Sequence, residues 1–481
     1  MLFLCRKAYF CIMARKKINP LFTNILVTDA GAKGKSIAKA PDGKIIFLDH
    51  AIPGDIVDIQ IMKKRTAFYE GQVVKFHAYS DKRATPICKH FGICGGCKWQ
   101  NMKYTEQLFY KQNEVKQNLE RIGHLHIDEF KPILACENPY QYRNKMEFSF
   151  SDSRWLTKEE IADTQTPFDR RAFGFHKPGM WDKIIDISEC FLQQEPSNAI
   201  RNGLKQFAIS HNLSFFNPRA QTGFLRTMMI RITSTGAVMV ILQFNENNQP
   251  NIKLVLDYLA NNFSQIDSLQ YIVNNKGNDS IYDQEVILYK GTDHIIEVME
   301  GLQFAINAKS FYQTNSAQAY QLYKVVREFA DLTGEELVYD LYTGTGTIAL
   351  FIAKNAKKVV GIESVPEAIL DAQNNAKQNN IANTSFFVGD MAKLFTDAFI
   401  AENGHPDVII TDPPRDGMHK NVIDQLLKIL PKKIVYVSCN SATQARDLSL
   451  LKSHYTVKLS RAVDMFPQTH HVENVVLLAR K

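Results

Sequence analysis

The sequence of 481 residues has no apolar run of the length that a membrane-spanning helix needs, which is about 20 residues. It also has no internal repeat and no low-complexity tract, which excludes repeat architectures. The N-terminus is only weakly signal-like, because Arg6 and Lys7 interrupt its apolar residues and no small-residue cleavage site follows. We therefore expect a cytoplasmic protein without membrane contact, and we interpret residues 1–16 as an N-terminal extension in which Met13 is an alternative start.

Cysteine is scarce, and eight cysteines in a chain of this length do not form a secreted disulfide framework. Three of them fall within ten residues, however, and the intervening Gly95 and Gly96 allow a tight turn around one centre. A closed thiolate site needs a fourth ligand, and we favour Cys190, at the end of an isoleucine-rich strand pattern, over Cys136. The spacing leaves both zinc and an iron–sulfur cluster open. The candidate metal ligands are Cys88, Cys94, Cys97 and Cys190.

Acidic residues are outnumbered near the N-terminus, where thirteen lysines and arginines stand against seven acids between Met13 and Arg83. This region holds most of the net charge of +7, and a basic face attracts polyanions such as nucleic acid. Residues 17–76 also contain about five short strand patterns separated by turns, which is typical of a small closed barrel of the oligonucleotide-binding kind. We predict an RNA-binding barrel here; solvated lysines on an ordinary small barrel are the alternative.

The remaining chain indicates two further domains. A helical pattern over 101–122 and mixed strands and helices up to residue 309 predict an α+β central domain over 77–309. From residue 310 onward strands and helices alternate, which predicts a parallel, doubly wound sheet over 310–481. Two last strand patterns without a helix between them, Tyr455–Asp464 and Val472–Ala479, predict a terminal antiparallel pair. The fold class is multidomain α/β.

A glycine turn follows the first strand of this last domain and opens a helix. Gly344 and Gly346 let the backbone approach a ligand, although the third glycine of the dinucleotide fingerprint is missing. Glu363 ends the second strand, 23 residues after Asp340, where an acid can accept hydrogen bonds from ribose hydroxyls. The pattern predicts a nucleoside-type cofactor; a surface glutamate is the alternative for Glu363.

Three chemically distinctive side chains follow later strands: Asp412 in Asp-Pro-Pro-Arg, Cys439 in Ser-Cys-Asn, and Glu473 in His-Val-Glu. The residue after Asp-Pro-Pro is Arg415 instead of an aromatic, which argues against methyl transfer to an amine. A thiolate with a nearby carboxylate indicates covalent catalysis with proton removal. Addition of the thiolate to carbon 6 of uracil makes carbon 5 nucleophilic toward a sulfonium methyl, and a base then removes the carbon 5 proton. A buried structural thiol is the alternative for Cys439.

These motifs, in this order, resemble the RNA (uracil-C5)-methyltransferases of the RumA/RlmD type, which act on large-subunit ribosomal RNA. The resemblance covers nearly everything from about residue 17 onward and includes Ser310–Asn315. It implies a TRAM β-barrel, a central α+β domain with a four-cysteine site, and a C-terminal Rossmann-like class I methyltransferase domain. The domains expected are 1–16 (extension), 17–76 (TRAM barrel), 77–309 (central) and 310–481 (methyltransferase).

The resemblance also implies the roles of individual residues. Cys439 is the expected nucleophile and Glu473 the expected base, and the four cysteines are expected to carry a [4Fe-4S] cluster. Thr343 stands where the family commonly has a cysteine, and we expect cofactor binding to survive this change. The residues expected to bind S-adenosylmethionine are Gln313, Tyr342, Gly344, Glu363 and Asp412.

The implied reaction is methylation of carbon 5 of a uridine in 23S rRNA by a monomeric enzyme. Three alternatives are the same chemistry on a tRNA uridine, methyl transfer to an RNA or DNA amine, and a non-catalytic RNA-binding assembly factor. The intact Cys439, Glu473 and Glu363 count against the last of these.

Overall fold

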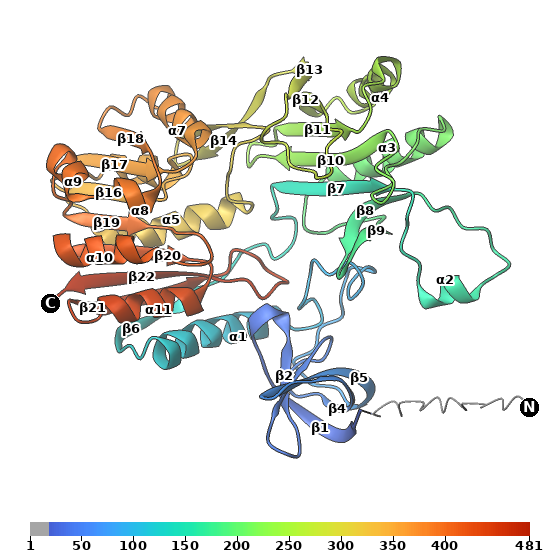
Figure 1. Cartoon of the computed structure of the whole chain (residues 1–481), viewed down its shortest axis with the longest axis horizontal. Coiled ribbons are helices and arrows are strands. Elements are labelled where there is room, and N and C mark those ends of the chain that lie inside the picture. The colour runs from blue at the N-terminus through green and yellow to red at the C-terminus, as the bar shows by residue number, and fades with distance from the viewer. Residues whose placement is uncertain (1–18) are drawn as a thin grey trace, which may run out of the picture. The chain divides into compact units, whose positions relative to one another are not determined.

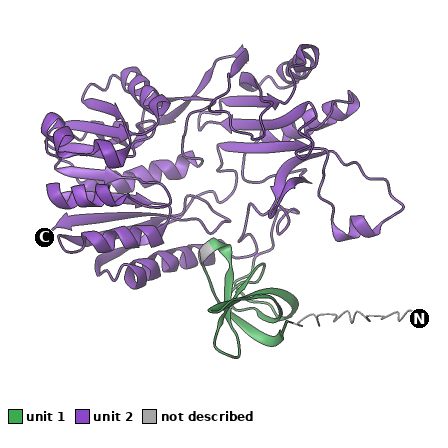
Figure 2. Cartoon of the chain, viewed as in Figure 1, with its two compact units in different colours: residues 1–83 green, residues 84–481 purple. Residues whose placement is uncertain are grey.

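The computed structural model describes residues 19–481, so the N-terminal extension expected over 1–16 lies outside the described residues. The chain divides into two compact units, one that ends at Arg83 and one that spans Ala84–Lys481 (Figure 2). Within the described part, no helix combines the length and the apolar character that crossing a bilayer requires.

The first unit is a closed five-stranded barrel, which confirms the predicted barrel fold. Its strands follow the order β1-β2-β3-β5-β4. Alternate residues of β4, such as Val57 and Ile59, are fully buried because successive side chains point to opposite faces of the barrel wall. Gly71 lies directly over this core, where an added Cβ would come 2.4 Å from the Ile59 side chain. The strands are β1 (Leu21–Ala30), β2 (Ser36–Lys39), β3 (Ile45–Leu48), β4 (Ile56–Lys64) and β5 (Phe68–Ala78).

The second unit contains a seven-stranded sheet of order β13-β12-β11-β10-β7-β8-β9 (Figure 1). Every residue of its central strands β10 and β11 is buried, because both faces of the sheet are covered. Met228 packs into a core with α3 and α4, whereas the next residue, Met229, belongs to a core that continues into the C-terminal part of the chain. The strands are β7 (Lys145–Ser151), β8 (Ala172–Lys177), β9 (Met180–Asp186), β10 (Leu225–Ile232), β11 (Val238–Phe244), β12 (Ile266–Val273) and β13 (Ile287–Gly291). The helices are α2 (Lys158–Ala162), α3 (Ser197–Ser210) and α4 (Gln249–Asn262).

An eight-stranded sheet of order β18-β17-β16-β19-β20-β22-β21-β6 forms the rest of this unit. Its strands β16 to β20 are parallel, and β21 and β22 form the predicted antiparallel pair. This confirms the expected Rossmann-like fold. The strands are β16 (Leu337–Leu341), β17 (Lys358–Glu363), β18 (Thr384–Val388), β19 (Val408–Thr411), β20 (Lys433–Ser438), β21 (Tyr455–Val463) and β22 (Glu473–Arg480). The helices are α5 (Ser316–Ala330), α6 (Thr347–Ala353), α7 (Pro366–Gln378), α8 (Met391–Leu394), α9 (Asp397–Asn403), α10 (Lys420–Ile429) and α11 (Ser441–Leu451), and a separate hairpin is formed by β14 (His294–Met299) and β15 (Leu302–Asn307).

One edge of the eight-stranded sheet comes from a distant part of the sequence. Strand β6 (Ile127–Leu134) pairs in parallel with β21. The sequence patterns did not predict this pairing. The preceding helix α1 (Tyr104–Gln117), which confirms the helical pattern expected from residue 101, packs against the same strands. A segment from before the seven-stranded sheet is therefore part of the C-terminal sheet.

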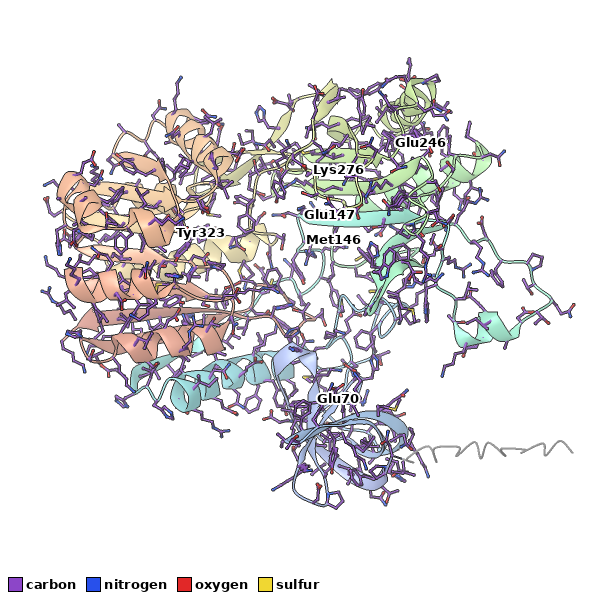
Figure 3. All side chains as sticks on the ribbon, in the orientation of Figure 1. Glu70, Met146, Glu147, Glu246, Lys276 and Tyr323 are labelled. Carbon is purple, nitrogen blue, oxygen red and sulfur yellow. The ribbon has the colours of Figure 1, made fainter. Side chains whose placement is uncertain are left out.

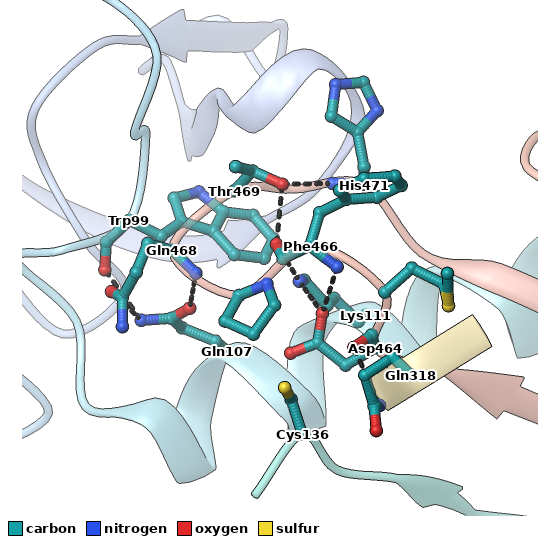
Figure 4. Close-up of polar contacts among 12 residues, drawn as sticks. Trp99, Gln107, Lys111, Cys136, Gln318, Asp464, Phe466, Gln468, Thr469 and His471 are labelled. Carbon is teal, nitrogen blue, oxygen red and sulfur yellow. Dashed lines mark hydrogen bonds and ion pairs between the residues drawn. The ribbon is translucent and has the colours of Figure 1, made fainter. Parts of the chain in front are cut away.

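A buried polar network fastens α1 to the loop between β21 and β22 (Figure 4). Lys111 lies fully buried and donates to the Asp464 carboxylate at 2.5 Å and to the Phe466 carbonyl at 3.0 Å. One helical turn earlier, Gln107 donates from its amide to Gln468 Oε1 and accepts from the Gln468 backbone N–H. Residues four apart share a helix face, so both side chains hold the same loop.

We expect Lys111→Met to destabilise the fold by about 3–5 kcal/mol, because it leaves the Asp464 carboxylate buried without a counter-ion. Urea unfolding followed by tryptophan fluorescence measures the loss as a lower midpoint. Lys116→Met on the same helix is the matched control, since its ion pair with Glu120 is exposed and contributes at most about 1 kcal/mol. The Lys111→Met/Asp464→Asn double variant removes the uncompensated charge, and its failure to recover stability would contradict the ion-pair explanation.

Candidate active site and cysteine site

The register of two neighbouring strands places the candidate nucleophile opposite the candidate base. Strands β20 and β22 are antiparallel, and their last ladder pair joins Ser438 to Asn474. Cys439 follows Ser438 and Glu473 precedes Asn474, so these two residues occupy the next facing positions across the ladder. Cys439 is half-buried, whereas Glu473 is buried. The carboxyl edge of the sheet thus presents a thiol and a carboxyl group side by side.

Asp412 enters the same edge from β19, which lies between β16 and β20. Its carboxyl group interacts with those of Asp340 and Glu473. Tyr323 of α5, labelled in Figure 3, is buried and interacts with all three carboxyl groups. Burial raises the pKa of Tyr323, and the negative charges of Asp412, Asp340 and Glu473 raise it further. The Tyr323 hydroxyl has a hydrogen-bonding partner in Thr347 Oγ1 at 3.1 Å. Three strand ends therefore contribute carboxyl groups to one poorly solvated crevice.

These carboxyl groups hold protons more tightly than usual. Burial raises the pKa of Glu473 to about 8, and the nearby Asp412 contributes to the increase. Burial likewise raises the pKa of Asp412 to about 7, with a further contribution from Asp340. Such acids take up and release protons near neutral pH, which is the property of a general base.

The Cys439 thiol is subject to opposing influences. Burial raises its pKa to about 11, and the charges of Glu473 and Asp412 act in the same direction. The guanidinium of Arg415 lies beside the thiol and lowers its pKa. The backbone carbonyl of Arg415 accepts hydrogen bonds from Asn440 Nδ2 and Thr443 Oγ1, both at 3.0 Å, which fix the Asp-Pro-Pro-Arg loop over the start of α11. The positive charge of Arg415 therefore favours the thiolate form of Cys439.

The glycine turn has the geometry that a close backbone approach requires. Gly346 has a φ of +75°, and a Cβ there would lie 2.8 Å from the Cβ of Ala372. The Gly344 N–H donates to Glu363 Oε2 at 3.2 Å, so the carboxylate at the end of β17 faces the turn as expected for a ribose-binding acid. Tyr342 also has a positive φ, of 64°, and burial raises its pKa to about 12. The structure thus brings together the residues at which the sequence predicts a nucleoside-type cofactor.

The segment that contains Gln313 is attached to this turn. Thr345 Oγ1 donates to the Phe311 carbonyl at 3.4 Å, and Asn144 Nδ2 donates to the Gln313 carbonyl at 2.8 Å. Arg231 donates to the Ser310 carbonyl at 2.7 Å. Two residues of the seven-stranded-sheet region thus hold the segment near the glycine turn.

Four cysteines line a single cavity of about 600 Å³. They are Cys88, Cys94, Cys97 and Cys190, whereas Cys136 is buried elsewhere, beside Asn315. Gly95 makes the tight loop possible, because it has a φ of +77° and a Cβ there would lie 2.3 Å from Pro178. No group of three or more His, Cys, Asp or Glu side chains within residues 19–481 is arranged to hold a single metal ion. The structure therefore brings the four predicted ligands to one cavity, but not into the arrangement of a single-ion site.

Two loops of the candidate active site also border this cysteine cavity. Thr314 follows Gln313, and Thr469 lies four residues before Glu473. In addition, the backbone N–H groups of Lys98 and Trp99 donate to the Gln468 carbonyl at 2.9 and 3.0 Å. The residues directly after Cys97 thus support the loop that leads to the candidate base.

Comparison with known families agrees with this geometry. The family model described as tRNA (Uracil-5-)-methyltransferase matches residues 230–481, and the TRAM domain model matches residues 23–74. The chain belongs to the tRNA (uracil-5-)-methyltransferase family. This confirms the resemblance inferred from the motifs, and it supports S-adenosylmethionine as the methyl donor and RNA as the substrate.

Relatives of this family member match it over almost its whole length. It is 54% identical to a protein of Bacteroides thetaiotaomicron named an uncharacterized RNA methyltransferase, over 93% of this chain and 99% of that protein. A protein of Porphyromonas gingivalis with the same name is 50% identical, over 94% and 99% respectively. The crystal structure of Pyrococcus abyssi tRNA (uracil-54, C5)-methyltransferase in complex with S-adenosyl-L-homocysteine has a TM-score of 0.73 and 28% identity, and it covers 95% of this chain and 100% of that one.

The sequence patterns did not predict that Tyr323 belongs to the site of this methyltransferase. They also did not predict that Arg415 lowers the pKa of the Cys439 thiol. Tyr323 lies in a helix that the patterns did not single out, and nothing in its sequence neighbourhood marks it. Arg415 directly follows a recognised motif, so its position could have been used as a signal. The sequence does not give the direction in which its side chain points.

We expect alkylation of Cys439 by iodoacetamide to accelerate as the pH rises toward about 11, because only the thiolate reacts. Glu473→Gln should accelerate the reaction several-fold at about pH 9, since it removes a negative charge and each unit of thiol pKa changes the thiolate population about tenfold. Arg415→Gln should slow it. Mass spectrometry of the Cys439 peptide gives the rate, and the Cys136 peptide is the internal control. Equal rates in all three proteins would contradict the assigned influences.

Proposed function

We propose that this methyltransferase transfers a methyl group from S-adenosylmethionine to carbon 5 of a uridine in 23S rRNA, through a covalent adduct between Cys439 and carbon 6 of the base. The observation that carries the proposal is the facing position of Cys439 and Glu473 across the β20–β22 ladder. Methylation of carbon 5 needs a nucleophile that adds to the base and a general base close to that nucleophile.

The proposed steps assign one role to each residue. Cys439, with its thiolate favoured by Arg415, adds to carbon 6 and places the electron pair on carbon 5. Carbon 5 forms a bond to the sulfonium methyl, and S-adenosylhomocysteine leaves. Glu473 then accepts the carbon 5 proton, and the electrons of that C–H bond reform the 5,6 double bond and expel the thiolate of Cys439. The raised pKa of Glu473 makes it a stronger base than an exposed glutamate.

The cofactor residues act by position. Glu363 and Gly344 are proposed to bind the nucleoside part of S-adenosylmethionine, because the carboxylate already faces the glycine turn. Gln313, Tyr342 and Asp412 are proposed to complete the site at its open side. The proposed occupant fits the open space at Gly344, where an added Cβ would meet no atom within 4 Å.

We also propose that the four cysteines hold a [4Fe-4S] cluster. All four line one cavity, and burial raises the pKa values of Cys88, Cys97 and Cys190, which is unfavourable for isolated thiolates but is reversed by metal binding. The cluster would supply Fe–S bonds that cross-link the loop of residues 88–97 to the segment after β9.

A tRNA uridine is the second candidate substrate. The TRAM barrel and the four-cysteine site support ribosomal RNA as the substrate, because they resemble those of the RumA/RlmD type. However, the Pyrococcus abyssi protein is named for tRNA and aligns over 95% of this chain, so the architecture alone does not separate the two substrates. We propose that the protein acts as a monomer in the cytoplasm, where both RNAs are found.

We expect labelled S-adenosylmethionine to give 5-methyluridine in unmodified 23S rRNA and none in unmodified tRNA, read as nucleosides by mass spectrometry. Cys439→Ala should abolish the product without changing RNA affinity, because the thiol acts only after binding. The product in tRNA alone would keep the mechanism and overturn the substrate. Methylation by Cys439→Ala would overturn the mechanism.

We expect Cys190→Ser to lose most of its iron and its visible absorbance after anaerobic purification, because a ligand of the proposed cluster is missing. Cys136→Ser is the matched control, since its thiol is buried outside the cysteine cavity. Iron per chain is measured against protein determined by amino-acid analysis. Equal iron in both variants would refute the four-cysteine assignment.

A further inference from the structure

A second cavity, of about 550 Å³, lies between the end of β6, the first turn of α5 and the segment that precedes β7. Its size falls within the range of small-ligand sites, about 300–1,000 Å³. None of the residues proposed for methyl transfer or for the cluster lines it. The exposed Gln141 and Asn138 form part of its rim, so the cavity is open to solvent.

Two arginines from distant parts of the sequence line this cavity, and Arg143 also lines the neighbouring cysteine cavity. Arg143 precedes β7, and Arg461 lies on β21. Each has one weak bond to a backbone carbonyl, from Arg143 Nε to Lys145 at 3.4 Å and from Arg461 Nε to Pro132 at 3.3 Å. Within residues 19–481 neither guanidinium forms an ion pair, and Glu137 is the acid that shares the lining. Guanidinium groups without a carboxylate partner are suited to bind phosphate.

The uncharged part of the wall carries amides that are not used by the fold. The side chains of Gln141, Gln194 and Gln321 line the cavity and form no hydrogen bond to another described residue. A primary amide offers both donors and an acceptor, which suits the hydrogen-bonding edges of an unpaired base. Other polar residues of the lining, such as Asn315, are already bonded and form the frame.

The frame connects the cavity to the methyl-transfer apparatus. Asn144 Nδ2, which lines the cavity, donates to the Gln313 carbonyl and to Ser316 Oγ, both at 2.8 Å. Asn315 Nδ2 donates to the Met465 carbonyl at 3.0 Å, in the loop that leads to Glu473. A ligand in the cavity therefore lies next to the segments that position the cofactor and the base. It does not contact the residues proposed for methyl transfer.

We propose that this cavity binds one unpaired nucleotide of the RNA that is methylated, with its phosphate on Arg143 and Arg461 and its base against the free amides. The proposal rests on the proposed function in that the ligand is the substrate RNA. The nucleotide is a neighbour of the target uridine, and its capture orients the RNA strand relative to Cys439.

The test is Arg461→Gln, compared with Arg480→Gln as the matched control. Arg480 lies on the adjoining strand β22 and also donates to one backbone carbonyl, that of Leu430 at 2.7 Å, but it does not line the cavity. Affinities for transcripts of a 23S rRNA fragment and of tRNA are measured by fluorescence anisotropy over a range of salt concentrations, without S-adenosylmethionine. Arg461→Gln should weaken binding of the preferred RNA about tenfold and reduce the salt slope by about one, whereas Arg480→Gln should change neither.

A second variant tests the base contacts independently. Gln321→Ala should weaken RNA binding several-fold with an unchanged salt slope, because it removes an uncharged contact. S-adenosylhomocysteine affinity, measured by calorimetry, should stay unchanged in all three variants, which excludes a disturbed cofactor segment. If Arg461→Gln does not fold, Gln321→Ala decides the question.

Equal RNA affinity in Arg461→Gln, Gln321→Ala and the parent would overturn the cavity assignment, as would equal losses in Arg461→Gln and Arg480→Gln. The binding assay does not depend on turnover. Absence of 5-methyluridine with normal RNA binding by the parent protein would therefore count against the proposed function and not against the cavity.

Discussion

The arrangement of the active site depends on one buried ion pair, between Lys111 and Asp464. A charge pair removed from water contributes little by itself, but loss of one partner is costly, so the pair fixes the geometry of whatever it joins. It joins α1 to the loop after β21, and the end of that loop is the start of β22. Glu473 is the first residue of β22. The position of the candidate base thus depends on a helix more than 350 residues earlier in the chain. The two residues of the ion pair are 353 residues apart.

The crevice itself works against stability. Asp340, Asp412 and Glu473 all have raised pKa values, and an acid whose pKa is higher in the folded than in the unfolded protein reduces stability as the pH rises above its ordinary pKa. Asp340 Oδ1 is buried without a hydrogen-bonding partner in the described part of the chain. Natural folds tolerate such local conflicts mainly at functional sites, where raised proton affinity is needed. The surrounding apolar strands of the parallel sheet offset this cost.

The sequence predicted the local elements well and the long-range pairings poorly. The alternation of strands and helices after residue 310 and the final pair β21 and β22 were expected, because short β-branched and aromatic runs between turns are local signals. Strand β6 was not expected: it contains two acids and Pro132, which an edge strand tolerates, and its partner β21 lies about 330 residues later. The motif residues Cys439 and Glu473 were identified in advance. Their facing register was not, because it depends on the insertion of β22 between β20 and β21.

The cysteine site lies beside the loops that carry the proposed cofactor and base residues. The cavity that the four cysteines share is bordered by Thr314 and Thr469, the neighbours of the proposed cofactor and base loops. The backbone after Cys97 donates directly to Gln468, which α1 also holds through Gln107. The base loop is therefore attached on one side to the buried network of α1 and on the other to the cysteine loop. A cross-link among the cysteines would restrict the second attachment, and its effect would reach Glu473 through the backbone.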